Sequence, residues 1–180
     1  MQIRLGYLGA RYISSNLEKI GYGLDGFIID GKLTEKSIIL YYSDPVTEKT
    51  VRFPDGAIFP CWRFVEIPIK LDSDMVKLAE YFDKLRTLLE LNREDTEGFP
   101  IGYEKVCRAF ADFIIMKSLD KELLKSGLWD IAISCCYFFS EPEKNKKIFE
   151  ILKLTEELSD CFKLNIDIEK LKALVILHII

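Results

Sequence analysis

The sequence predicts an α+β fold, in which a small antiparallel β-sheet lobe (residues 1–71) is followed by a bundle of about five helices (residues 72–180). Seven of the ten glycines precede residue 57 and four of the six prolines lie between residues 45 and 68, so the first lobe is divided into short segments. From Leu71 onward, apolar residues recur at helical spacing with few breakers. The chain has 180 residues, 49% of them hydrophobic, which suits two lobes that share one core.

The first lobe is expected to open with a strand and a short helix. Ile3–Leu8 is typical of a strand. Ser14 or Ser15 can cap a helix that runs through Ile20, because a serine side chain satisfies free N–H groups at a helix start. The glycines of Gly6–Gly9 stand where a phosphate-binding loop would, but their spacing matches neither the dinucleotide motif nor the Lys-containing nucleotide motif. We therefore expect a turn at these glycines.

Two further strands are predicted around a polar turn. Phe27–Ile29 and Ser37–Tyr42 are typical of strands, and Asp30-Gly31 is the strongest turn signal between them. Thr50–Phe53 is expected to pair back on the second of these strands.

The lobe is expected to close with a turn and an edge strand. Proline fixes φ and glycine accepts a positive φ, so Pro54-Asp55-Gly56 predicts a turn. Trp62–Ile69 predicts a strand, and Pro68 confines its end to a sheet edge because proline has no N–H to donate. The whole lobe is interpreted as one meander of four or five strands.

The helical lobe is predicted from caps and apolar stripes. An Asp or Ser side chain can accept N–H groups at a helix start, and apolar residues three and four apart mark the buried face. The expected caps are Asp72 or Asp74, Asp120, Ser140 and Asp167. The expected buried faces are Met75, Leu78, Ala79, Phe82, Leu85 and Leu89; Tyr103, Val106, Cys107, Phe110, Phe113 and Ile114; Ile148, Ile151, Leu152, Thr155, Leu158 and Phe162; and Ile168, Leu171, Leu174 and Val175.

One helix is expected to be enclosed by the others. Leu128–Phe139 is apolar nearly all round, which is typical of the centre of a bundle, and Gly127 is expected to interrupt the segment before it. Phe110 and Phe138 are both predicted to be buried, so Phe→Ala at either position should cost about 3–5 kcal/mol.

The cysteine and histidine content excludes several kinds of site. The five cysteines are odd in number and four lie in apolar helical segments, which favours buried free thiols in a reducing cytoplasm over a disulfide framework. Cys135 and Cys136 predict core thiols rather than a redox pair. The single histidine, His178, cannot supply a two-histidine metal site or a histidine-based catalytic pair. We identify no catalytic, metal-binding or cofactor-binding residue.

The charge of the chain is close to balanced. The net charge is −4; the first lobe carries nine Lys/Arg against eight Asp/Glu, and the second carries 16 against 21. Neither half has the basic excess that is usual in proteins that coat nucleic acid. Cations and aromatic rings are nevertheless mixed near the N-terminus, as in single-strand binders, at Arg4, Arg11, Lys19, Tyr7, Tyr12 and Tyr22. A nucleic-acid-binding subunit that uses this N-terminal Arg/Tyr face is therefore one alternative.

The densest local feature is Phe59–Arg63. Cys61 and Arg63 would share a strand face, where a guanidinium can lower the pKa of a thiol, but no base accompanies them. Trp and Arg are enriched in interaction hot spots, although Trp62 can also pack where strands meet helices. The candidate partner-binding residues are therefore Trp62, Arg63, Tyr7, Arg11 and Tyr12.

We interpret the sequence as that of a non-enzymatic binding or regulatory protein that acts through protein–protein contacts, such as an accessory subunit, an immunity protein or a mobile-element inhibitor. The acidic helical lobe would suit a basic partner, for example a protein that handles nucleic acid. A second alternative is a metal-dependent enzyme with carboxylates that meet only in the fold. No window of 18 or more apolar residues exists and no signal peptide is recognised at Met1, so we expect a cytoplasmic protein without a membrane partner.

The last eight residues, Ala173–Ile180, are apolar except for His178. Exposed in water they would form a patch that monomers avoid, so we expect this run to dock into the helical lobe or to be covered by a second copy or a partner. His178 is expected to interact with carbonyl groups at the end of the last helix.

Overall fold

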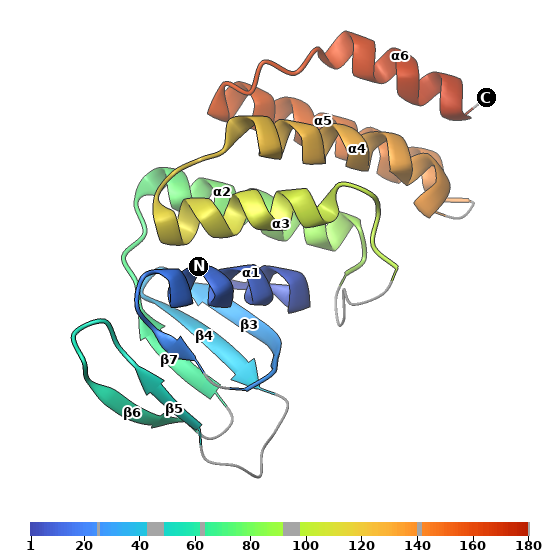
Figure 1. Cartoon of the computed structure of the whole chain (residues 1–180). Helices are drawn as coiled ribbons and strands as arrows, with labels where there is room; N and C mark the ends of the chain where they lie inside the picture. Colours follow the sequence, from blue (N-terminus) through green and yellow to red (C-terminus); the bar gives the residue numbers. More distant parts are fainter. Residues whose placement is uncertain (25, 43–48, 62–63, 92–97, 140–141, 180) are drawn as a thin grey trace.

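The structure is a computed structural model that describes residues 1–24, 26–42, 49–61, 64–91, 98–139 and 142–179. It confirms the α+β fold: an antiparallel sheet near the N-terminus carries a stack of helices that ends with the C-terminal helix (Figure 1). Among the described helices, none combines the length and the apolar character that crossing a membrane requires.

The strands form two antiparallel sheets instead of the single meander expected. The strands are β1 (Gln2–Arg4), β2 (Gly23–Leu24), β3 (Ile28–Thr34), β4 (Ser37–Tyr42), β5 (Lys49–Arg52), β6 (Ile58–Cys61) and β7 (Phe64–Pro68). The larger sheet has the order β1-β3-β4-β7, and the smaller has the order β2-β5-β6.

The helices stack in layers on one side of the larger sheet. They are α1 (Gly6–Lys19), α2 (Ser73–Leu88), α3 (Tyr103–Ala111) with a π-helical turn at its end (Asp112–Met116), α4 (Lys121–Phe138), α5 (Lys144–Phe162) and α6 (Ile168–Ile179). Helix α1 packs on the sheet and α3 packs on α1 (Figure 1). Helix α4 then contacts α3, α5 and α6, so it is the central helix of the bundle, as its sequence predicted.

The first strand is shorter and the first helix longer than predicted. Strand β1 ends at Arg4, and α1 begins at Gly6 rather than at Ser14 or Ser15. The glycines that were expected to form a turn are therefore in the helix. The reason is that the helix start is capped from a distant strand, by Asp30, instead of by a local serine.

Asp30 and Gly31 lie inside β3, which corrects the prediction of a turn there. The strand continues to Thr34, whose hydroxyl accepts the N–H of Ser37 at 2.9 Å and so closes the turn into β4. The pairing of β3 with β4 shifts register between Ile28 and Asp30, which makes a β-bulge.

The pairing predicted for Thr50–Phe53 is wrong. Strand β5 pairs with β2 and β6, because β4 already has β3 on one side and β7 on the other. The turn at Pro54–Gly56 is confirmed, since the N–H of Phe53 donates to the carbonyl of Ala57 at 2.8 Å across it. Pro68 ends β7, and β7 is an edge strand of the larger sheet, as predicted.

The predicted helix caps are largely confirmed. The side chains of Asp72, Asp120 and Asp167 accept N–H groups in the first turns of α2, α4 and α6, at 2.9, 3.0 and 3.0 Å. The cap predicted at Ser140 lies outside the described residues. Helix α5 begins only at Lys144, after a turn.

The buried apolar residues of the sheet and the bundle form one core. Its helical part contains most of the residues predicted from the stripes, with Phe113, Ile168 and Leu174 half-buried. Gly127 does not interrupt α4; it allows the start of α3 to approach α4, because a Cβ on Gly127 would lie 2.9 Å from the carbonyl oxygen of Gly102.

Two predictions of burial are wrong in part. Phe138 is half-buried rather than buried, because α4 ends there and the neighbouring Tyr137 faces solvent. Cys107, Cys135 and Cys136 are buried thiols, whereas Cys161 is exposed on the outer side of α5. Burial, and then the neighbouring Cys136, raise the pKa of Cys135 to about 12, which keeps that thiol protonated.

The C-terminal helix docks on its own chain. Helix α6 contacts α4 and α5, and its Leu171 and Val175 are buried. Ile176 and Leu177 face solvent on the other side. His178 interacts with a side chain rather than with helix carbonyls: its Nδ1 lies 2.7 Å from the hydroxyl of Tyr137.

Candidate functional site

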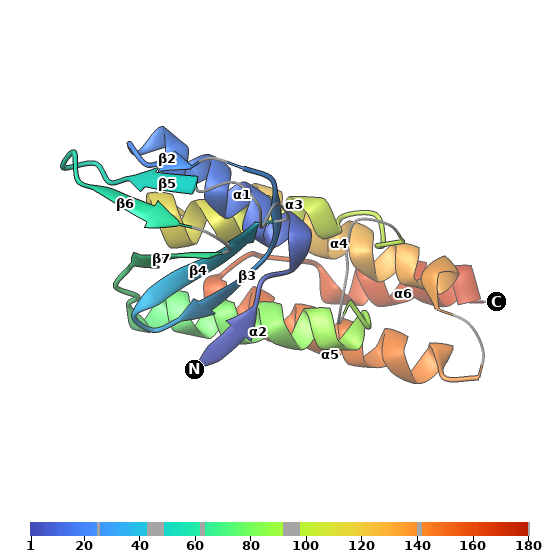
Figure 2. The same cartoon turned by 90° about the horizontal axis from the view of Figure 1, so that it is seen from below.

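The larger sheet has one covered face and one open face. Helix α1 packs on the covered face, whereas no described helix lies on the other side, which is seen from below in Figure 2. On the uncovered side, Arg4 pairs with Lys32, Asp30 pairs with Tyr41, and Tyr41 pairs with Phe64. Cross-strand partners project to the same side of a sheet, so these five residues share a surface that we name the open face.

The β-bulge in β3 decides which residues reach the open face. Ile28 pairs with Tyr42, whose side chain is buried on the covered side. Side chains alternate along a strand, so an unbroken strand would also turn Asp30 and Lys32 toward the core. The extra residue Ile29 reverses this parity and places both charged side chains on the open face.

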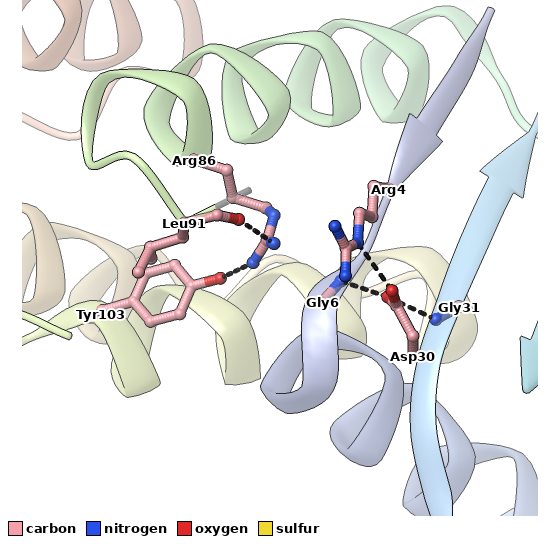
Figure 3. Close-up of polar contacts among 7 residues, drawn as sticks. All are labelled: Arg4, Gly6, Asp30, Gly31, Arg86, Leu91 and Tyr103. Atoms are coloured by element: carbon pink, nitrogen blue, oxygen red, sulfur yellow. Dashed lines mark hydrogen bonds and ion pairs between the residues drawn. The ribbon is translucent and has the colours of Figure 1, made fainter. Parts of the chain in front are cut away.

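The charged end of the open face is held rigidly by Asp30 (Figure 3). One of its carboxylate oxygens, Oδ2, accepts Nε of Arg4 at 2.6 Å. The other, Oδ1, accepts the N–H of Gly6 at 3.0 Å and that of Gly31 at 2.7 Å. The carboxylate thus fixes Arg4, the beginning of α1 and the middle of β3 to one another.

The aromatic end of the open face consists of two rings and a lysine. The Tyr41 and Phe64 rings have centroids 6.4 Å apart at an interplanar angle of 52°. The ammonium of Lys32 lies 5.9 Å from the centroid of Tyr41. Phe64 is 54% exposed.

A hollow of about 470 Å³ lies beside these groups. Its lining consists of Gln2, Ile3, Arg4, Asp30, Lys32 and Tyr41. The lining offers charge, hydrogen bonds and an aromatic surface to a bound group, and its one carboxylate already accepts three hydrogen bonds. Such a lining is suited to binding a ligand or a partner side chain.

A buried arginine lies against the start of α1, close to the Arg4–Asp30 pair (Figure 3). Arg86 of α2 is only 3% exposed; its guanidinium donates to the hydroxyl of Tyr103 at 2.5 Å and to the carbonyl of Leu91. It also lies against the backbone of Gly6, where a Cβ would be 2.2 Å from Nη1. Arg86 therefore packs α2 and α3 directly against the start of α1.

The sequence-predicted candidates are spread over several surfaces. Tyr7 is half-buried against the core, and Arg11 is exposed on α1. The hydroxyl of Tyr12 donates to Glu104 of α3, and Tyr22 packs edge-on against Phe53 in the smaller-sheet region. Of the predicted N-terminal Arg/Tyr face, only Arg4 lies on the open face.

Trp62 and Arg63 lie outside the described residues, and their role in partner binding stays a prediction.

The pKa of the Tyr12 hydroxyl is raised to about 12, first by burial and then by the Glu104 carboxylate. Its ring also has the guanidinium of Arg108 at 6.0 Å.

Sequence reasoning missed Lys32, Tyr41 and Phe64 as candidates. The alternation in Ser37–Tyr42 and Phe64–Pro68 would have identified two faces of the sheet, but not which face the helices leave open.

For the metal-dependent alternative, the described part of the chain contains no group of three His, Cys, Asp or Glu side chains placed to hold an ion.

Comparison of the chain with models of known protein families, with curated proteins and with solved structures finds no match.

Proposed function

We propose that this protein is a non-enzymatic binding protein that acts through protein–protein contacts, and that the open face of the larger sheet receives its partner. The observation that carries the proposal is the contact between half-buried Tyr41 and exposed Phe64 on a sheet face that no described helix covers. Exposed apolar surface with a polar rim is typical of interaction sites. Aromatic residues and arginine are also the residues enriched at the centres of interfaces.

The charge of the open face favours a protein partner over nucleic acid. Arg4 is ion-paired with Asp30, and Glu66 lies on the same side of the sheet, opposite Ile39. Binding to a phosphate backbone depends on several cations that have no acidic neighbours. Among the described residues that strand pairing places on the open face, Lys32 is the one cation besides the paired Arg4.

The face is also rigid enough to be a binding surface. Four paired strands hold its side chains, and Asp30 and Arg86 fix the adjoining helix start. A surface that is already ordered loses little conformational entropy when a partner binds.

The test is site-specific photo-crosslinking in the source cells. Phe64 is replaced by a photoreactive phenylalanine analogue, and the matched control carries the analogue at Phe149 of α5, which is 58% exposed against 54% for Phe64. We expect one protein to be crosslinked from position 64 and not from position 149. The purified partner should then bind the wild type and Phe149→Ser equally, and bind Phe64→Ser at least about ten-fold more weakly.

Two results would contradict the proposal. One is a purified partner whose affinity is the same for Phe64→Ser and Phe149→Ser, with both variants folded by circular dichroism. The other is salt-sensitive binding of single-stranded oligonucleotides to the wild type that is lost in Tyr41→Ser. That result would show that the open face binds nucleic acid.

A further inference from the structure

We infer that the partner presents an extended segment with an acidic side chain at one position and apolar side chains two and four residues away. The carboxylate binds beside Lys32 in the hollow, and the apolar side chains lie on Tyr41 and Phe64. This inference rests on the proposed function of the open face and specifies the chemistry of its partner.

The charges around the hollow favour an acidic side chain of the partner. The negative charge of Asp30 is balanced by the Arg4 guanidinium, by the N–H of Gly6 at the positive end of the α1 dipole and by the N–H of Gly31 in β3. Lys32 faces the hollow, and within the described residues its ammonium has the Tyr41 ring as a neighbour and no carboxylate at ion-pair distance.

Apart from Asp30, strand pairing places Glu66 on the same surface, but Glu66 is too far away to balance Lys32. Glu66 lies on β7 and Lys32 on β3, with Ile39 of β4 between them. Two strand spacings separate these backbones, about 9–10 Å. An incoming carboxylate would therefore gain a charge-assisted hydrogen bond that no described group now makes to Lys32.

The spacing of the three side chains sets the spacing of the motif. The Lys32 ammonium is 5.9 Å from the Tyr41 ring, and that ring is 6.4 Å from the Phe64 ring. An extended chain advances about 3.3–3.4 Å per residue, and its side chains alternate, so positions two apart lie on the same side at about 6.6–6.8 Å. An acid at position i with apolar residues at i+2 and i+4, in either chain direction, matches both steps.

The volume of the hollow agrees with this occupant. About 470 Å³ lies within the range of natural ligand pockets and accommodates the carboxylate side chain and part of its backbone. Tyr41, at the border of the hollow, and its neighbour Phe64 of β7 are left for the apolar side chains.

The experiment is selection from a random peptide display library against the folded full chain. Wild type, Lys32→Glu and Tyr41→Ser are the targets, with Lys153→Glu on the exposed side of α5 as the charge-matched control. We expect wild type and Lys153→Glu to enrich the same acid–x–apolar–x–apolar peptides. Lys32→Glu should lose the acid from the motif, and Tyr41→Ser should enrich none of these peptides.

A synthetic pair then measures the acid directly. A selected peptide with Asp should bind wild type at least about ten-fold more tightly than its Asn counterpart, because a charge-assisted hydrogen bond is roughly twice as strong as a neutral one. The two peptides should bind Lys32→Glu equally weakly.

The outcomes separate this inference from the proposed function. Peptides that need Tyr41 but show no acidic preference, or an equal affinity of the Asp and Asn peptides, would overturn the inference and leave the open face as a protein-binding site. Selection of no Tyr41-dependent peptide would overturn both.

Discussion

Asp30 caps helix α1 from the neighbouring strand: its Oδ1 accepts the N–H of Gly6, 24 residues earlier in the chain, at 3.0 Å. The first N–H groups of a helix have no partner within the helix, and a local Asp or Ser usually accepts one of them. Here a strand residue does so and places its charge at the positive end of the helix dipole. The same residue holds Arg4, so the helix start and the open face depend on one carboxylate.

The first prediction is that Asp30→Asn lowers the free energy of unfolding by about 1–2 kcal/mol, because the shape is kept while the ion pair and the dipole interaction are lost. Urea unfolding measures it. The control is Asp55→Asn, which alters a local turn contact to the N–H of Ala57 at 2.9 Å and should change stability by no more than about 0.5 kcal/mol. Equal losses for the two variants would mean that the cap contributes nothing special.

Gly6 and Gly56 allow the contact with Arg86 to be measured separately from backbone strain. Both have positive φ, +74° and +91°, but a Cβ on Gly6 would meet the guanidinium of Arg86, whereas a Cβ on Gly56 would meet nothing within 4 Å. Gly56→Ala should cost about 1–2 kcal/mol from the left-handed backbone alone. Gly6→Ala should cost about 2 kcal/mol more, because Arg86 is buried and bonded and cannot move freely. Similar melting temperatures for the two variants would refute the contact.

The helical lobe could be predicted from the sequence because its signals are local. Asp72 and Asp167 each accept the N–H of the residue three positions later, and the stripes of α2 and α5 follow helical spacing. The beginning of α1 could not be predicted, because it depends on Asp30 and Arg86, which are distant in the chain.

The open face was hidden from the sequence for two reasons. The bulge at Ile29 changes which residues of β3 face outward, and the Asp30-Gly31 pair beside it is typical of a turn rather than of a bulged strand. Which side of the sheet is left uncovered depends on where α1 packs, which the alternation of strand residues does not specify. Tyr41 and Phe64 meet only through the pairing of β4 with β7.

Phe110 and Phe138 were expected to be equivalent in the core, and the structure separates them. Phe110 is 1% exposed and stacks on Phe82 at 4.4 Å between ring centroids, whereas Phe138 is half-buried at the end of α4. Phe110→Ala should therefore cost about 3–5 kcal/mol and Phe138→Ala about half as much. Thermal or chemical denaturation gives both values. A larger loss at Phe138 would mean that the last turn of α4 is more enclosed than described.

The raised pKa of Tyr12 predicts a loss of stability at alkaline pH. Tyrosine in an unfolded chain has a pKa of about 10, whereas burial and Glu104 raise the pKa of Tyr12 in the folded protein to about 12. The folded state holds this proton more tightly, so the contribution of Tyr12 is present below pH 10 and is lost as the pH rises through 12. Over that interval, the unfolding free energy of Tyr12→Phe should fall less than that of wild type. Parallel curves would show that Tyr12 ionises alike in both states.

The last prediction concerns α6, where two leucines allow its inner and outer sides to be compared. Leu171 is fully buried and Leu177 is 70% exposed, so the same Leu→Ala change removes packing in one case and only surface in the other. Leu171→Ala should cost about 2–5 kcal/mol and Leu177→Ala no more than about 0.5 kcal/mol. Because Leu171 packs within its own chain, its loss should be the same at every protein concentration. If Leu177→Ala instead lowered the melting temperature, and did so more strongly in concentrated than in dilute protein, the outer side of α6 would be in contact with a second copy.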